Sequence, residues 1–133
     1  MSEDTRDFPL ARHLGMSTRV TARGGAEATL RVTDALLNPH GSVHGAVLFA
    51  MVDTAMGAAT MSVLTGDSRC ASADLQLRFC RPVFAGPLVA RAQVLRAGKR
   101  LVHLEAKVTD EEGHLVSFGT GAFAVIPGEI STG

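Results

Sequence analysis

The stretch of residues 43–64 constrains the fold of this chain more than any other segment. Its 22 residues are almost entirely apolar, apart from His44, Asp53 and a few Thr, Ser and Gly residues. A run of that length is long enough to span a bilayer. However, a carboxylate at its centre is costly in a membrane, no basic cluster flanks it, and Ala, Gly and Met outnumber Leu and Ile. The segment therefore predicts a helix over residues 45 to about 62 that is buried inside a soluble protein.

Short strands are predicted on both sides of this helix. Before it, residues 16–22 and 26–33 are rich in Val, Thr and Leu, and Arg23-Gly24-Gly25 between them is typical of a hairpin turn. After it, apolar and polar residues alternate with the period of half-buried strands. These later strands are expected over residues 73–79, 88–97, 100–109 and 114–126. The apolar side of the first of them is expected to consist of Ala73, Leu75, Leu77 and Phe79.

The connections between these strands determine how they assemble. The predicted turns are short, so neighbouring strands must run antiparallel. A helix with apolar residues all round must be covered on most sides. An antiparallel sheet of about five to six strands wrapped around one long central helix satisfies both demands, which predicts an α+β fold. With 133 residues and no internal repeat, the chain is expected to form a single domain over residues 1–133.

The charge balance and the cysteine content exclude several classes of protein. The chain has 13 Lys and Arg residues against 13 Asp and Glu residues, so nothing overall attracts nucleic acid or an anionic membrane. Cys70 and Cys80 form no C-x-x-C pair, and residues 1–12 are too polar for a signal peptide, which predicts a cytoplasmic protein. The His residues show no metal-ligand spacing and no G-x-S-x-G or Walker-type segment occurs, which argues against a metal site, a serine hydrolase and a nucleotide-driven enzyme.

Asp53 is the first candidate for chemistry because it is the only charged residue of the predicted helix. Asp is rarely buried without a partner, and a bare buried carboxylate becomes protonated rather than staying charged. Two interpretations follow. Either the side chain reaches the rim of the protein and bonds a backbone amide, or it is a functional carboxylate.

The start of the helix, Asn38-Pro39-His40-Gly41-Ser42-Val43-His44-Gly45, is the second candidate. A helix N-terminus presents free N–H groups that can hold an oxyanion as charge develops on a carbonyl. Gly45 has no side chain, so a ligand could approach its N–H closely. Ordinary capping by Ser42, or an Asn-Pro turn, explains the same residues without any function.

The spacing of these two candidates bears on where a site can lie. Gly45 and Asp53 are eight residues apart, which is roughly 12 Å along one helix. A reacting carbon must lie within about 3–3.5 Å of its nucleophile, so one helix cannot easily bring both groups to the same carbonyl. If both groups are catalytic, the site is expected between two antiparallel copies of the chain.

Two further features carry weaker signals. Ser72 lies near the start of a strand, just before Asp74, where its hydroxyl either positions a water or is simply exposed to solvent. Lys99 and Arg100 follow Gly98 in a turn, where they either meet phosphate or form a solvated turn. The other candidate cations are Arg78, Arg81 and Arg96.

These residues resemble the pattern of a known family. The matching segments are Asn38-x-x-Gly41-x-x-His44-Gly45, Asp53 eight residues later, Ser72 before Asp74, and Arg81-Pro82. They are similar to the hotdog-fold thioesterases of the phenylacetate-degradation type, the PaaI-like group. The resemblance covers roughly residues 8–127, the expected core of the domain. One departure is Ala46, where the family usually has a second glycine, and this implies a slightly narrower pocket mouth.

The resemblance implies an enzyme that hydrolyses acyl-CoA or aryl-CoA thioesters to a carboxylic acid and free CoA, as a homodimer or homotetramer without a metal or cofactor. The N–H of Gly45, assisted by Asn38, would polarise the thioester carbonyl. Asp53 of the partner subunit would act as general base or nucleophile, with Ser72 orienting the attacking water and His44 shaping the turn. An apolar acyl tunnel is expected to include Phe49, Met56, Phe79 and Phe84, and the CoA phosphates are expected to meet Lys99, Arg100, Arg81 and Arg78.

Two other functions stay open at this point. Hotdog domains also serve as effector-binding modules, so the chain can be a non-catalytic acyl-CoA sensor. A sensor would gain nothing from keeping Asp53, and no DNA-binding segment is recognised in the sequence. The third function is that of a hotdog dehydratase or hydratase, but those enzymes rely on a His with a Glu or Asp in a different local motif.

Overall fold

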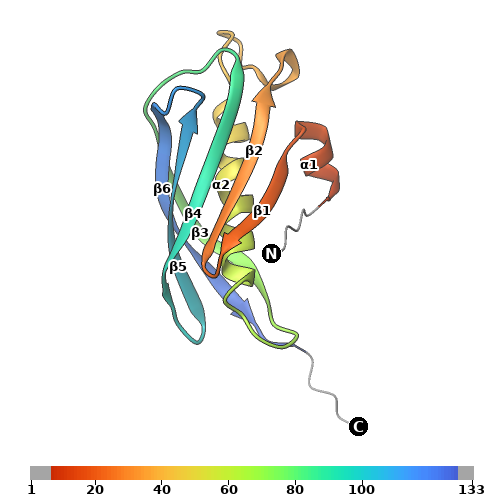
Figure 1. The fold of residues 1–133 in the computed structure, drawn as a ribbon, viewed down its shortest axis with the longest axis vertical. Coiled ribbons are helices and arrows are strands. Elements are labelled where there is room, and N and C mark those ends of the chain that lie inside the picture. Colours follow the sequence, from red (N-terminus) through yellow and green to blue (C-terminus); the bar gives the residue numbers. More distant parts are fainter. Residues whose placement is uncertain (1–6, 129–133) are drawn as a thin grey trace.

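An antiparallel sheet curves around one long helix in this protein (Figure 1). The computed structural model describes residues 7–128. Its elements are α1 (Pro9–Leu14), β1 (Ser17–Ala22), β2 (Gly25–Val32), a short 3₁₀ turn (Asp34–Leu36), α2 (Gly45–Met61), β3 (Arg69–Phe79), β4 (Gly86–Ala97), β5 (Leu101–Asp110) and β6 (Leu115–Ile126). The predicted order of two strands, a long helix and four more strands is confirmed within these residues, and with it the hotdog fold class.

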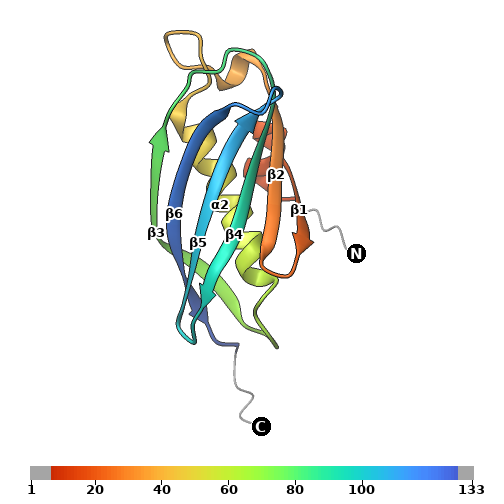
Figure 2. The ribbon, with the colours of Figure 1, turned by 60° about the vertical axis from the view of Figure 1, so that its left-hand side comes forward.

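The strands of the sheet follow the order β1-β2-β4-β5-β6-β3, and every pair of neighbours is antiparallel (Figure 2). Tight turns join β1 to β2, β4 to β5 and β5 to β6 as hairpins. Gly24 and Gly113 have positive φ angles of 86° and 85° in two of these turns, a conformation that glycine adopts at little cost. The chain passes from β2 through α2 to the far edge of the sheet, which leaves β1 and β3 as its two edges.

One side of α2 packs against the sheet and forms the core with it. Met51, Val52, Ala55 and Met56 on this side are 0 % exposed. None of the helices within the described residues has the length and hydrophobicity that crossing a bilayer requires. In β5, buried and exposed residues alternate as the sequence pattern predicts: the buried ones are Val102, Leu104, Ala106 and Val108, and the exposed ones are His103, Glu105 and Lys107.

The other side of α2 is not covered by the sheet, and we call it the open face. Its residues are spaced three or four apart along the helix, so they share one side of it. Phe49 is 40 % exposed there. The expectation that the helix is wrapped on most sides is therefore not met within one chain, because the sheet curves around only one side. The residues of the open face are Ala46, Phe49, Ala50, Asp53, Thr54, Gly57 and Met61.

A β-bulge in β3 determines which of its side chains face α2. The pairing with β6 shifts register between Ser72 and Asp74, so Ala73 is an extra residue at this point. The side chains on the α2 side are therefore Cys70 and Ser72 before the bulge, and Leu75 after it. The prediction that the strand begins with Ala73 on its apolar side is wrong. The strand begins four residues earlier, and Ala73 is exposed because it lies in the bulge.

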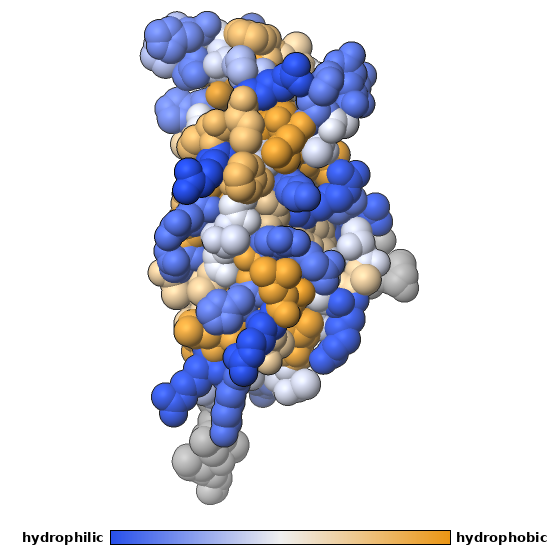
Figure 3. Space-filling view, turned by 90° about the vertical axis from the view of Figure 1, so that its left-hand side faces the viewer, coloured by the Kyte–Doolittle hydropathy of each residue, from blue (hydrophilic) through white to orange (hydrophobic). Residues whose placement is uncertain are grey.

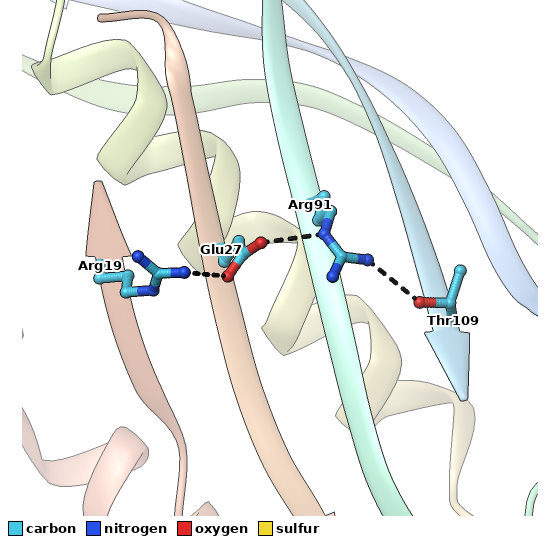
Figure 4. A network of polar contacts seen from close by, with 4 residues as sticks. All are labelled: Arg19, Glu27, Arg91 and Thr109. Carbon is cyan, nitrogen blue, oxygen red and sulfur yellow. Dashed lines mark hydrogen bonds and ion pairs between the residues drawn. The ribbon is translucent and has the colours of Figure 1, made fainter. Parts of the chain in front are cut away.

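A row of polar side chains crosses the face of the sheet that points away from α2 (Figure 4). Glu27 accepts hydrogen bonds from Arg19 at 3.0 Å and from Arg91 at 2.9 Å. Arg91 also donates to Thr109 Oγ1 at 3.3 Å. Arg19, Glu27 and Arg91 are direct partners across β1, β2 and β4. Each such pair stabilises a sheet by about 0.2–1 kcal/mol, so the row favours this register over one slipped by a residue.

Apolar side chains also reach the surface of the molecule. On the side shown at the left of Figure 1, they gather in an upper and a lower area with polar side chains between them (Figure 3). Exposed apolar surface of this kind often marks a contact with another molecule. Within residues 7–128, the large apolar residues that are exposed are Leu10, Phe49, Phe79, Phe84, Leu95, Leu101, Leu115 and Phe118.

Candidate active site

Asp53 lies in the middle of the open face of α2. Its Oδ1 atom is buried and has no hydrogen-bond partner among residues 7–128. Burial raises the pKa of the Asp53 carboxyl above its ordinary value of 3.8, and a hydrogen bond with the Ser72 side chain opposes this rise. No backbone amide of the described residues bonds Oδ1. The carboxyl therefore has the increased proton affinity that suits a general base.

Ser72 reaches Asp53 from β3 because of the bulge. The two residues are 19 positions apart in the sequence, yet their side chains are hydrogen-bonded and they line the same groove. A hydroxyl both donates and accepts hydrogen bonds, so Ser72 can bond the carboxylate and hold a water beside it. The structure thus brings together two of the residues that the sequence singles out.

His44 caps the N-terminus of α2. Its Nδ1 atom accepts a hydrogen bond from the Ala46 N–H at 2.9 Å, and its carbonyl accepts one from the Val47 N–H at 2.9 Å. The Gly45 N–H has no acceptor among the described residues. The cap is therefore His44 rather than Ser42, and the first N–H of the helix stays available to an anionic ligand.

Asn38 holds the loop that precedes α2. Its Oδ1 atom accepts hydrogen bonds from the His40 N–H at 2.8 Å and the Ser42 N–H at 3.2 Å. Its Nδ2 atom donates to Ser42 Oγ at 3.0 Å. A side-chain amide has two N–H groups, so Asn38 keeps a second donor beyond this loop. Because Asn38 lines one groove with Gly45, that donor is available near the free N–H of the helix.

Two grooves lie along the open face and a third adjoins them at the N-terminus of α2, and the second groove shares residues with each of the other two. The first, of about 580 Å³, contains Asp53 and Ser72. The second, of about 520 Å³, contains Gly45 and Asp53. The third, of about 440 Å³, contains Asn38 and Gly45. The second groove therefore links the carboxylate to the helix N-terminus.

The separation of Gly45 and Asp53 limits what one chain can do with these grooves. Both lie on one uninterrupted helix, eight residues apart, and this corresponds to roughly 12 Å. A carbonyl carbon in contact with one of them is out of reach of the other. Within one chain, either group can act on a carbonyl, but not both on the same one.

The predicted acyl-binding residues are divided between different parts of the molecule. Phe49 and Phe79 line the second groove together with Asp53. Phe84 does not reach this groove, because it lines a separate pocket of about 350 Å³ beside the β5–β6 turn. Met56 is fully buried against the sheet and lines none of these grooves. The structure therefore brings two of the four aromatic and apolar candidates to Asp53.

The predicted phosphate-binding cations are also spread over the surface. Arg81 lines the third groove. Arg78 pairs across the sheet with Phe118, on the strand face opposite to Leu77. Lys99 and Arg100 are exposed in the β4–β5 turn, at the end of the sheet far from the N-terminus of α2 (Figure 1). The four cations do not form one cluster within a single chain.

The wall of the first groove was not predicted from the sequence. Phe8 and Leu10 reach it from the N-terminal segment, and Phe123 reaches it from β6, directly opposite Ser72 in the sheet. The pairing of β3 with β6 joins segments far apart in the chain, so no local pattern reveals it. The one available signal was the apolar character of Phe8 and Leu10 in an otherwise polar N-terminal segment.

Asp110, Glu112 and His114 form the one cluster of the described residues that could hold a metal ion. Their ligand atoms lie within 4.8 Å of one another in the β5–β6 turn. Asp110 Oδ1 accepts hydrogen bonds from the His114 N–H at 2.9 Å and the Glu112 N–H at 3.0 Å. The bond from the His114 N–H contributes most to lowering the pKa of the Asp110 carboxyl. These contacts explain the cluster as a stabilised turn, and it lines none of the grooves around Asp53.

The fold and the site together define a hydrolase of the hotdog class. A six-stranded antiparallel sheet around one helix carries a carboxylate in the middle of that helix and an available N–H at its start. Comparison with known proteins identifies the family, because the model of the thioesterase superfamily matches residues 40–117. The chain belongs to this superfamily, and its reaction is the hydrolysis of a thioester.

Individual relatives agree with this assignment along most of the chain. The acyl-coenzyme A thioesterase PaaI of Escherichia coli (strain K12) is 35 % identical over 122 residues, which covers 91 % of this chain and 85 % of that protein. The solved structure of the E. coli PaaI protein matches with a TM-score of 0.83 and 32 % identity, covering 92 % of this chain and 87 % of that one. The solved structure of a thioesterase from Haemophilus influenzae matches with a TM-score of 0.83 and 26 % identity, covering 88 % of this chain and 82 % of that one.

Proposed function

We propose that this protein hydrolyses acyl-CoA or aryl-CoA thioesters to a carboxylic acid and free CoA. The observation that carries this proposal is Asp53, whose Oδ1 atom is buried without a partner in a groove that also holds Ser72. The Oδ1 atom has no bond within the described residues that would explain its position, and the carboxyl has an increased affinity for a proton. The similarity to an acyl-coenzyme A thioesterase over most of the chain supports CoA as the leaving group.

In this reaction Asp53 takes a proton from a water that Ser72 orients, and the water oxygen attacks the thioester carbonyl carbon. The Gly45 N–H donates to the carbonyl oxygen as negative charge develops on it, with Asn38 as a second donor. Collapse of the tetrahedral intermediate breaks the C–S bond, and the sulfur leaves with the proton that Asp53 had taken. Direct attack by the Asp53 carboxylate, followed by hydrolysis of the anhydride, gives the same products.

Measurement of free-thiol release tests this function. The purified protein should release CoA thiol from at least one member of a panel of short, long, aryl and hydroxyaryl CoA esters. Tight binding of acyl-CoA without thiol release would instead favour a sensor. Conversion of an enoyl- or hydroxyacyl-CoA with the thioester left intact would favour a dehydratase or hydratase.

We further propose that the active site is shared between two copies of the chain, with a homodimer as the minimum unit and a homotetramer as the complete assembly. Gly45 and Asp53 are too far apart along α2 to act on one carbonyl from the same subunit. The open face and the 11-residue edge strand β3 both lack a cover in the single chain. A second copy laid antiparallel would cover both, and it would bring its own Gly45 to the first copy's Asp53.

Mixed dimers test this sharing directly. One subunit carries Asp53→Asn and the other carries Gly45→Pro, and two different affinity tags allow the mixed dimer to be isolated after co-expression. If the site is shared, one of the two active sites of the mixed dimer contains both an intact Gly45 and an intact Asp53, and the other contains neither. The mixed dimer should then have about half the kcat of the wild-type dimer, although each parent dimer is nearly inactive. Mixed dimers no more active than their parents would show that each subunit works alone.

The proposed CoA substrate also makes a prediction about Lys99 and Arg100. The chain has no net charge, so its attraction for the CoA phosphates must be local. Replacing both residues by Gln is expected to raise KM several-fold with little change in kcat. The reason is that contacts to the CoA phosphates stabilise the bound substrate and the transition state equally. The effect should weaken with added salt, since exposed charges are screened over about 8 Å at physiological ionic strength.

The control is a double Gln variant of two exposed cations far from this turn, Arg31 and Lys107, which removes the same charge. An unchanged KM at low salt in the Lys99 and Arg100 variant would assign the phosphates to Arg78, Arg81 or Arg96 instead.

The proposed compartment is the cytoplasm, because the exposed Cys80 thiol is in no disulfide and suits a reducing environment.

A further inference from the structure

Gly57 is a glycine in the interior of α2, where alanine would normally be more favourable. Its φ angle is not positive, so the backbone does not require glycine. A Cβ added at this position would meet only one neighbouring atom, Phe123 Cε2, at 3.6 Å, which is an ordinary van der Waals contact. Neither backbone conformation nor packing within the chain therefore explains why this residue lacks a side chain.

The position of Gly57 in the site suggests a reason. It lies four residues after Asp53, one turn further along the same side of the helix, and both residues line the first groove. Beyond Asp53 and Ser72 this groove is walled largely by apolar side chains, with Phe8 and Leu10 on the N-terminal side. Its volume of about 580 Å³ is in the range that binds small organic groups. The missing side chain at position 57 widens the groove directly beside the carboxylate.

We propose that Gly57 is a specificity-determining position that admits a bulky apolar acyl group, aryl or medium-chain alkyl, into the first groove. The inference rests on the proposed thioesterase function and adds the class of acyl group. With the thioester carbon at Asp53, the acyl group extends along α2 over Gly57 and lies against Phe123. Leu10 forms the outer wall. A methyl group at position 57 occupies the space that the acyl group needs.

The test is Gly57→Ala, assayed with phenylacetyl-CoA, hexanoyl-CoA and acetyl-CoA. The variant should melt about 3–5 °C higher than the wild type, because alanine favours the helix. At the same time kcat/KM should fall by about 10-fold or more for the two bulky esters, and stay within about twofold for acetyl-CoA. The ratio between the fall in kcat/KM for phenylacetyl-CoA and the fall for hexanoyl-CoA distinguishes an aryl from an alkyl substrate.

Leu10→Ala provides a second test that opens the groove instead of narrowing it. Leu10 is 50 % exposed, so its truncation leaves the core intact, and Leu95→Ala is a matched control at 58 % exposure outside all the grooves. Leu10→Ala should change the preference among bulky esters by several-fold, whereas Leu95→Ala should leave it unchanged.

Equal falls in kcat/KM for all esters in Gly57→Ala, or no fall for any ester, would overturn the inference. Absence of turnover in the wild type would instead overturn the proposed function.

Discussion

Replacement of Asp53 by Asn is expected to lower kcat by about 10²–10⁴-fold, the range that general acid–base catalysis contributes. Asn keeps the shape of the side chain but cannot take a proton from water or act as an anionic nucleophile. The expected loss is therefore in turnover, with acyl-CoA binding largely kept. Thiol release under saturating substrate measures kcat, and a binding assay with the inactive variant measures affinity. A variant with near-normal kcat would rule out Asp53 as the catalytic group and make the sensor the better interpretation.

The same variant should be more stable than the wild type at neutral pH. Burial raises the pKa of Asp53 in the folded chain above the 3.8 of the unfolded chain, so folding favours the protonated form. The folded state therefore loses stability as pH rises from 3.8 through the raised pKa, and the loss persists above it. Asn has no such dependence. Thermal melts across this pH window should show the variant's advantage shrinking towards low pH, and the acid limb of the wild-type kcat/KM profile should lie above 3.8.

The second large effect is expected from Gly45→Pro, which removes the N–H that we propose to hold the oxyanion. Loss of one such donor costs about 10²–10³-fold in kcat. The helix itself should tolerate the change, because Gly45 is its first residue and proline is favoured there. His44, with φ −68° and ψ 139°, already has the extended conformation that precedes proline. Circular dichroism and kinetics on the same sample separate folding from catalysis.

The matched control for this variant is Gly45→Ala, which keeps the N–H and adds a Cβ. That Cβ would lie 3.3 Å from the Phe79 ring, whose side chain is 57 % exposed and free to shift. Gly45→Ala should therefore retain most of the turnover that Gly45→Pro loses. Equal loss in both variants would assign the defect to crowding near Phe79 rather than to the missing donor.

The fold was largely predictable because its elements have strong local signals. The long apolar segment with few breaks predicted α2, and the alternation of residues 101–110 predicted β5 with its buried and exposed sides. Hairpin turns at Gly24 and Gly113 followed from the same local chemistry. The start of the first strand after the helix, and the side on which Ala73 lies, were predicted wrongly because a bulge reverses the alternation at Ala73. A strict two-residue period does not reveal an inserted residue.

The candidate site was predictable only where a residue was chemically unusual for its surroundings. Asp53 was unusual as the single charge of an apolar helix, and Gly45 as a glycine at a helix start. Phe123, Phe8 and Leu10 are ordinary apolar residues, so they became part of the site only through the pairing of distant strands and the position of α1. Phe84 was expected in the acyl tunnel with Phe49 and Phe79 on its apolar character alone, and the loop after β3 places it in a different pocket.

The bulge in β3 means that the orientation of Ser72 depends on how β3 pairs with β6 as well as on the identity of the residue. Removing Ala73 would leave every other side chain of the site unchanged. It would restore regular pairing with β6 while Ser72 stayed opposite Phe123 and Leu75 stayed opposite Gly121, so Ser72 would still face Asp53. A relative that keeps the extra residue but pairs regularly up to Leu75 would instead turn its Ser away from its Asp, and the two residues would lose their contact.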